Sequence, residues 1–162
     1  MNRASVVMAT YNGAEHIKAQ LDSIGRQSHR PHELVVSDDG STDATLRIVS
    51  AFAEKAAFPV RLRVNTQRLG YADNFLAATA LCEGDVIAFC DQDDEWHHDK
   101  LAICLAALQR EDAMLCAHTA TLIDGEGRYI GFYDQGISRS EVFPRLALPP
   151  WSLFLGMTQV FR

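Results

Sequence analysis

Apolar residues recur along the chain with two alternating periods. Short runs rich in Val and Ile, typical of strands, are each followed by a segment in which apolar residues lie three or four positions apart, as on one face of a helix. Ile17, Leu21 and Ile24 share such a face. The predicted strands cover residues 5–10, 33–39, 60–65 and 86–90, and the predicted helices cover residues 14–27, 42–56, 71–84 and 99–111.

Four successive strand–helix units predict an α/β sandwich, with a mostly parallel central sheet flanked by helices. The strand at residues 86–90 is the most apolar, so we expect it near the sheet centre. Ser41 or Thr42 is expected to cap the second helix. After residue 111 the pattern changes, and it predicts a strand at 113–124, a turn at 124–127, a second hairpin arm at 128–134 and a last strand near residue 162.

Composition narrows the class of protein. A chain of 162 residues with 48% hydrophobic residues favours one globular domain. The net charge of -6 argues against a general nucleic-acid binder, which needs a basic face. The four cysteines show no CxxC pairing, which favours free thiols in a reducing compartment. With no signal peptide or membrane span in the sequence, we expect a cytoplasmic protein, with peripheral membrane contact left open.

Polar residues gather where the predicted strands end. Because the carboxyl ends of parallel strands meet at one sheet edge, where α/β proteins bind ligands, these residues are expected to lie together. One such cluster would be ordinary turn chemistry, whereas four on one edge favour a binding site. The four clusters contain Thr10 and Tyr11, Asp38 and Asp39, Asn65 and Arg68, and Asp91, Asp93 and Asp94.

The three carboxylates of the last cluster lie within four positions, at the end of an apolar strand. Buried like charges need a positive partner. Mg²⁺ or Mn²⁺ would supply it, since both prefer oxygen ligands and Mg²⁺ is often held by one or two carboxylates plus substrate phosphates. A carboxylate such as Asp39 could accept a hydrogen bond from a base imide, and Tyr11 could lie against the base. The pattern therefore predicts a metal-bound nucleoside diphosphate.

Four stretches, VVMATYNG, ELVVSDDGSTDAT, NTQRLGYADNF and VIAFCDQDDEW, resemble family 2 glycosyltransferases of the GT-A fold. They occur in the family's order and cover roughly residues 3–100. The spelling is most similar to bacterial members that build surface polysaccharides, including rhamnosyltransferases. The resemblance implies a metal-dependent, inverting enzyme that transfers a sugar from a nucleoside-diphosphate sugar to a glycan or lipid-linked acceptor.

The resemblance also implies roles for individual residues. The nucleoside would be held near the first two strands, the diphosphate near Arg68, and the metal by the D-x-D element, with Asp93 the stronger candidate for direct contact. Asp94 would be a second ligand or a ribose contact, and Asp38 would support the turn. The implied nucleotide-binding residues are Thr10, Tyr11, Asp39, Arg68 and Asp91, and the implied metal ligands are Asp91, Asp93 and Asp94.

The catalytic base of the family lies in a segment beyond the position of Arg162, so it is not assigned here. We therefore expect a single, C-terminally truncated domain, with the donor half at about 1–100 and a partial acceptor region at about 101–162. Apolar residues of the tail would then favour self-association. The downstream acids are expected to be solvated turn residues; they are Asp124, Glu126 and Asp134.

Other classes use similar residues. A nucleotide-sugar-binding module without turnover is the alternative, because the base is missing. A sugar-nucleotide pyrophosphorylase needs a glycine-rich loop after the first strand, and ATYNGAEH does not provide one. A haloacid-dehalogenase-type phosphatase carries D-x-D after its first strand, not its fourth, and a dinucleotide oxidoreductase needs a G-x-G-x-x-G pattern that is absent.

Overall fold

The structure is a computed structural model and describes residues 3–133, 135, 139–144 and 156–162. In chain order the elements of these residues are β1 (Ala4–Thr10), α1 (Ile17–Gly25), β2 (Glu33–Asp38), α2 (Thr45–Ala53), β3 (Val60–Val64), α3 (Tyr71–Thr79), β4 (Val86–Cys90), α4 (Lys100–Arg110), β5 (Leu115–Ala117), β6 (Ala120–Ile123), β7 (Tyr129–Tyr133), the 3₁₀-helix η1 (Gly156–Thr158) and β8 (Gln159–Phe161).

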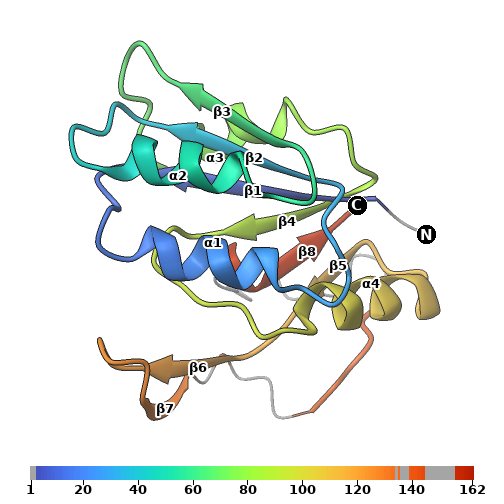
Figure 1. The fold of residues 1–162 in the computed structure, drawn as a ribbon. Helices are drawn as coiled ribbons and strands as arrows, with labels where there is room; N and C mark the ends of the chain where they lie inside the picture. The colour runs from blue at the N-terminus through green and yellow to red at the C-terminus, as the bar shows by residue number, and fades with distance from the viewer. Residues whose placement is uncertain (1–2, 134, 136–138, 145–155) are drawn as a thin grey trace.

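A six-stranded sheet with the order β3-β2-β1-β4-β8-β5 forms the body of the domain (Figure 1). Strands β1 to β4 run parallel, whereas β8 is antiparallel to both of its neighbours. The predicted α/β fold with a mostly parallel central sheet is therefore confirmed. The apolar strand β4 lies inside the sheet, as its sequence predicted, and the more exposed strand β3 lies at an edge.

Successive residues of β1 pack on opposite faces of the sheet, as the pleat of a strand requires. Val6 and Met8 belong to the larger core, which α1, α2 and α4 complete on one face. Val7 packs with Phe75 and Ala78 of α3 on the other face. Helices thus cover both faces (Figure 1), and the loops at the strand ends stay free to build a site.

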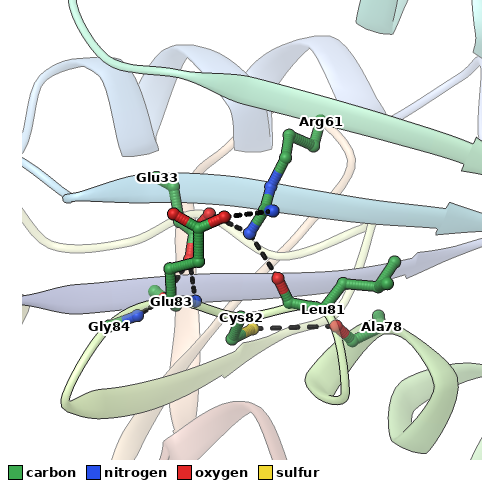
Figure 2. Close-up of polar contacts among 8 residues, drawn as sticks. Glu33, Arg61, Ala78, Leu81, Cys82, Glu83 and Gly84 are labelled. Atoms are coloured by element: carbon green, nitrogen blue, oxygen red, sulfur yellow. Dashed lines mark hydrogen bonds and ion pairs between the residues drawn. The ribbon is translucent and has the colours of Figure 1, made fainter.

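A charge network centred on the buried carboxylate of Glu33 joins the amino ends of three strands (Figure 2). The side chain of Glu33, only 3% exposed, accepts hydrogen bonds from Ser5 Oγ at 2.5 Å and from the Glu83 amide at 2.6 Å. Arg61 pairs with the same carboxylate and donates to the Leu81 carbonyl. The network therefore ties β1, β2 and β3 together at the edge opposite the polar strand ends.

The expected cap of α2 is wrong. The helix begins at Thr45, and no side chain caps it from its N-cap residue Ala44. Ser41 and Thr42 lie too far before the first turn, and the hydroxyl of Ser41 donates instead to Asp38 at 2.6 Å. Asp43 provides the local contact, accepting from the amide of Thr45 at 2.9 Å.

The strand expected at 113–124 is also wrong as a single element. Its first part, β5, pairs with β8 in the main sheet, and its second part, β6, pairs with β7 in a separate two-stranded sheet. The chain leaves the main sheet at His118, whose amide still donates to the Thr158 carbonyl at 3.2 Å. The hairpin and the last strand are confirmed as β6–β7 and β8.

Candidate functional site

The carboxyl ends of β1, β2 and β4 open into a pocket of about 370 Å³. Its floor comes from the strand ends and its walls come from the loops that follow them, together with the start of α3. The lining residues are Ala9, Thr10, Tyr11, Asp39, Arg68, Gly70, Tyr71, Asn74, Asp91, Gln92 and Asp93.

Most of the residues that the sequence singled out lie together in this pocket. Thr10, Tyr11, Asp39, Arg68, Asp91 and Asp93 all line it, and Asp94 is not among the lining residues. Sequence reasoning missed Tyr71, Asn74 and Gln92. Tyr71 and Asn74 belong to a segment that was predicted as a helix and quoted for the family resemblance without roles for these two residues, and Gln92 was treated as the spacer of the D-x-D element.

Asp38 supports the turn after β2, as the sequence predicted. Its buried carboxylate accepts from the amides of Gly40 and Ser41 at 3.0 and 2.7 Å. It also accepts from the hydroxyl of Thr10 at 2.7 Å. Because the Thr10 proton is directed to Asp38, Thr10 presents its backbone and its hydroxyl lone pairs, not an O–H donor, to the pocket.

Asp39 anchors the loop between β3 and α3. Its carboxylate accepts from the amides of Leu69 and Gly70 at 2.9 and 2.7 Å and from Asn65 Nδ2 at 2.9 Å. Burial of the carboxylate opposes ionisation, but these hydrogen bonds and the charge of Arg68 outweigh it and keep the pKa of Asp39 below its ordinary value. Asp39 is therefore an ionised acceptor at the pocket floor.

An aromatic platform lies beside Asp39. The guanidinium carbon of Arg68 sits 3.9 Å from the centroid of the Tyr11 ring, in cation–π contact. Tyr11 is 40% exposed, so its ring offers the flat apolar surface on which a base could lie. Gly70, with a φ of 83°, makes the turn that brings this loop over the strand ends.

The D-Q-D-D segment, residues 91–94, contains two carboxyl groups whose pKa is raised. Burial, and then the charge of Asp93, raise the pKa of Asp91, although Tyr71 Oη donates to Asp91 Oδ1 at 3.2 Å. Burial, and then the charges of Asp91 and Asp93, raise the pKa of Asp94 to about 6. Oδ2 of Asp94 is buried without a hydrogen-bond partner among the described residues. This corner of the site therefore gains from a cation.

One resident cation lies beneath the segment, and the sequence did not reveal it. Lys100, the first residue of α4, is 7% exposed, and its Nζ lies 3.7 Å from the Trp96 ring centroid. The same Nζ donates to the Met157 carbonyl at 2.5 Å. Burial lowers the pKa of Lys100 to about 8, while the nearby thiols and carboxylates favour its charged form.

Helix α1 holds the backbone of the segment in place. The Trp96 amide donates to Ser23 Oγ at 2.9 Å. In the amide orientation that satisfies both ends of Gln20, Nε2 lies 2.7 Å from the Asp94 carbonyl and Oε1 lies 3.1 Å from Trp96 Nε1. Trp96 accordingly packs in the core, and His97 stays exposed before α4.

The pocket fits a divalent ion only with help from a ligand. Among the described residues, no three His, Cys, Asp or Glu side chains gather closely enough to hold an ion alone. Asp91 and Asp93 line the pocket, and one or two carboxylates completed by phosphate oxygens is a common way of binding Mg²⁺. The donor set therefore fits an ion that arrives with a diphosphate.

The family model described as "Glycosyl transferase family 2" matches residues 5–152. The chain belongs to glycosyl transferase family 2.

The relatives of this family 2 chain include proteins with assigned roles. It is 34% identical over 107 residues to the amylovoran biosynthesis glycosyltransferase AmsB of Erwinia amylovora, covering 65% of this chain and 36% of AmsB. Against TarS of S. aureus in complex with UDP, the TM-score is 0.64 at 28% identity, covering 70% of this chain and 34% of TarS. Against the mannosyltransferase PcManGT of Pyrobaculum calidifontis in complex with GDP-Man and Mn²⁺, it is 0.65 at 31% identity, covering 70% and 34% of the respective chains.

The chain spans 39% of the length of the curated relatives that it matches first. Within the described ranges, no helix combines the length and the apolar character needed to cross a membrane. Two of the downstream acids are engaged locally: Asp124 and Glu126 both pair with Arg128 in the β6–β7 turn. Asp134 and the apolar residues Trp151 and Phe154 lie outside the described residues.

Proposed function

We propose that this family 2 domain binds a nucleoside-diphosphate sugar with Mg²⁺ or Mn²⁺ and takes part in inverting transfer of the sugar to a glycan or lipid-linked acceptor. The observation that supports the proposal is the pocket at the carboxyl edge. It joins an ionised acceptor, an aromatic platform, a guanidinium and two carboxylates, supplied by Asp39, Tyr11, Arg68, Asp91 and Asp93.

Asp39 would select the base. A carboxylate has about four acceptor positions, and three hydrogen bonds from the protein occupy Asp39. One position remains for a donor in the pocket. Uracil and thymine offer an imide N–H and guanine a lactam N–H, whereas adenine and cytosine present a ring nitrogen acceptor at the corresponding edge. The proposal therefore favours UDP, dTDP and GDP sugars, in keeping with the nucleotides bound by TarS and PcManGT.

The diphosphate would lie between Arg68 and the D-Q-D-D segment. Arg68 would donate to phosphate oxygens, and Asp91 and Asp93 would hold the ion. When bound, the ion would stabilise negative charge on the departing nucleoside diphosphate. Tyr71, by donating to Asp91 Oδ1, would orient that carboxylate for its role.

A binding module without turnover is a second candidate, and one observation favours it. Among the described residues, the carboxylates that line the pocket are Asp39, Asp91 and Asp93. The first is occupied by loop donors and the other two are needed for the ion. None of the three is then left to deprotonate an acceptor hydroxyl.

Calorimetry with UDP, dTDP and GDP, each with and without Mn²⁺, tests the proposal. We expect at least one of them to bind, and to bind more tightly with the metal. Failure of a folded sample to bind any of the three would refute the proposed function. Sustained sugar transfer by the chain would exclude the binding module, whereas metal-linked binding without transfer or donor hydrolysis would favour it.

The cellular setting is inferred from the relatives. The name of AmsB places that protein in the synthesis of amylovoran, and we infer a comparable role for this family 2 chain in building a cell-surface polysaccharide. The division into a donor half at about 1–100 and a partial acceptor region at about 101–162 belongs to the same proposal. The proposal also includes a location in the cytoplasm or at the inner face of the membrane, and self-association of the chain.

A further inference from the structure

Gln92, the spacer of the D-Q-D-D segment, forms two reciprocal hydrogen bonds with the backbone of Tyr11. The amide of Tyr11 donates to Gln92 Oε1 at 3.0 Å, and Gln92 Nε2 donates to the carbonyl of Tyr11 at 3.2 Å. A primary amide can pair with a peptide group in this way because it carries both a donor and an acceptor. Gln92 therefore contacts Tyr11 as a neighbouring strand would.

The contact between Gln92 and Tyr11 lies just beyond the last paired residues of β1 and β4. Strands β1 and β4 are paired in parallel up to Met8 and Cys90, and beyond these residues the two chains separate into the loops that form the pocket. Gln92 lies two positions past Cys90, and Tyr11 lies three positions past Met8. The side-chain amide thus extends the connection between the strands past the end of the ladder.

Gly13 leaves the space that the amide occupies. A Cβ built on Gly13 would lie 2.3 Å from Gln92 Oε1 and 2.5 Å from its Cδ. The residues with φ in the left-handed region include Gly40, Gly70 and Gly127 but not Gly13. Room for the Gln92 amide, not an unusual backbone conformation, is therefore the reason for glycine at this position.

We propose that Gln92 is a positioning residue that sets the spacing between the two ends of the nucleotide site; this inference rests on the proposed function. Tyr11 forms the base end, and Asp91 and Asp93 form the metal end. The bonds between the base and the diphosphate limit the distance that a nucleoside diphosphate can span, so both ends bind together only when the two loops are held at a compatible distance. The amide of Gln92 supplies that constraint and so couples metal binding to nucleotide binding.

Two substitutions separate hydrogen bonding from packing. Gln92→Met keeps the length of the side chain and loses both hydrogen bonds, and Gln92→Ala loses the hydrogen bonds and the packing. Gln109→Ala, at an exposed position of α4, is the matched control. For each 162-residue chain, calorimetry measures the metal-linked factor, defined as the factor by which Mn²⁺ raises the affinity for UDP, or for GDP if the wild type prefers it. NMR titration measures binding of the free nucleoside without metal.

We expect both Gln92 variants to lower the metal-linked factor about five- to tenfold, the combined effect of two partly exposed hydrogen bonds. Binding of the free nucleoside should stay within about twofold, because the nucleoside occupies only one end of the site. A merely structural role would weaken both measurements together. If the wild type shows metal-linked binding and Gln92→Met keeps the full factor, the inference is overturned while the proposed function stands. If the wild type binds none of the nucleotides, the proposed function fails first.

Gly13→Ala gives an independent check. The added methyl would displace the flexible end of Gln92, so Gly13→Ala alone should reproduce the reduced metal-linked factor with little change in the unfolding midpoint. In the Gln92→Ala background the three atoms nearest to the added methyl are gone, and the second substitution should have no further effect. Additive losses in the double variant would contradict the steric link between Gly13 and Gln92.

Discussion

Replacement of Glu33 by Gln removes a buried negative charge from the network at the amino edge of the sheet. The carboxylate receives the Ser5 hydroxyl, the Glu83 amide and the Arg61 guanidinium. Gln offers one oxygen in place of two, so its NH₂ group must face a donor. Nε of Arg61 is already buried without a hydrogen-bond partner among the described residues, and the substitution leaves that guanidinium without its buried counter-charge.

The expected loss of stability follows from the exposure of the two partners. Breaking a fully buried ion pair costs about 3–5 kcal/mol. Arg61 has a side chain that is 38% exposed, and it keeps a second partner in Glu83, so we expect Glu33→Gln to lower the free energy of unfolding by about 2–3 kcal/mol. For a chain of this size, that loss corresponds to a decrease in Tm of about 5–10 °C.

Urea unfolding followed by circular dichroism measures the effect, with Glu83→Gln as the matched control. The Glu83 side chain is 68% exposed, so its neutralisation should change the free energy of unfolding by less than about 1 kcal/mol. Equal losses in the two variants would refute the reasoning. Because the network lies at the edge opposite the pocket, nucleotide binding by folded Glu33→Gln should match that of the wild type.

The same difference should depend on pH. Burial of the Glu33 carboxyl opposes its ionisation, but the hydrogen bonds from Glu83 and Ser5 and the charge of Arg61 outweigh it and hold its pKa below the ordinary 4.5. The stabilisation is therefore fully present above pH 4.5 and is lost as the pH falls through the folded-state pKa. The gap between wild type and Glu33→Gln should shrink on acidification, and a gap that stays constant would contradict this assignment.

Three further substitutions test the pocket and its surroundings. Asp93→Asn should remove most of the increase in nucleotide affinity that Mn²⁺ produces, measured by calorimetry, and an unchanged increase would exclude Asp93 as a ligand. Arg68→Met should weaken nucleoside diphosphate binding about tenfold or more through loss of charged hydrogen bonds, with a smaller effect on the free nucleoside; equal effects on both would contradict the placement of Arg68 at the diphosphate. The pKa of Lys100 is lowered from 10.5 to about 8 in the folded protein. Between these two pH values, Lys100 therefore binds a proton in the unfolded state that it has lost in the folded state. The free energy of unfolding of the wild type, relative to that of Lys100→Met, should therefore rise with pH over this range by up to about 1.4 kcal/mol per pH unit. Urea unfolding of both proteins at pH 8 and pH 10 measures this difference, and an equal difference at the two pH values would contradict the prediction.

The sequence by itself determined the alternation of strands and helices and the order in which the polar clusters occur. Both depend on local periodicity, which a chain carries whatever its partners are. Once the sheet is mostly parallel, the ends of β1, β2 and β4 must share one edge, so Thr10, Asp39 and Asp91 could be placed in one site from the sequence. The hairpin turn at 124–127 could also be predicted, since turn residues act locally.

Contacts between distant segments were decided only by the tertiary structure. Lys100 looks like an ordinary first residue of a helix, and only packing places its Nζ over Trp96 and against the Met157 carbonyl. Gln92 looks like a spacer until β1 and β4 lie side by side and bring Tyr11 within reach. Asp94 follows Asp93 directly, yet it is not among the residues that line the pocket, and its Oδ2 is buried without a hydrogen-bond partner among the described residues.

The physical reason is the same for the elements that were predicted wrongly. Ser41 donates its hydroxyl to Asp38, which lies nearer to it than the start of α2 does. Residues 113–124 form two strands because β8 pairs only with the first part of this segment. Local sequence sets what each segment prefers. Which side chain receives each hydrogen bond depends on neighbours that are far away in the chain and adjacent only after folding.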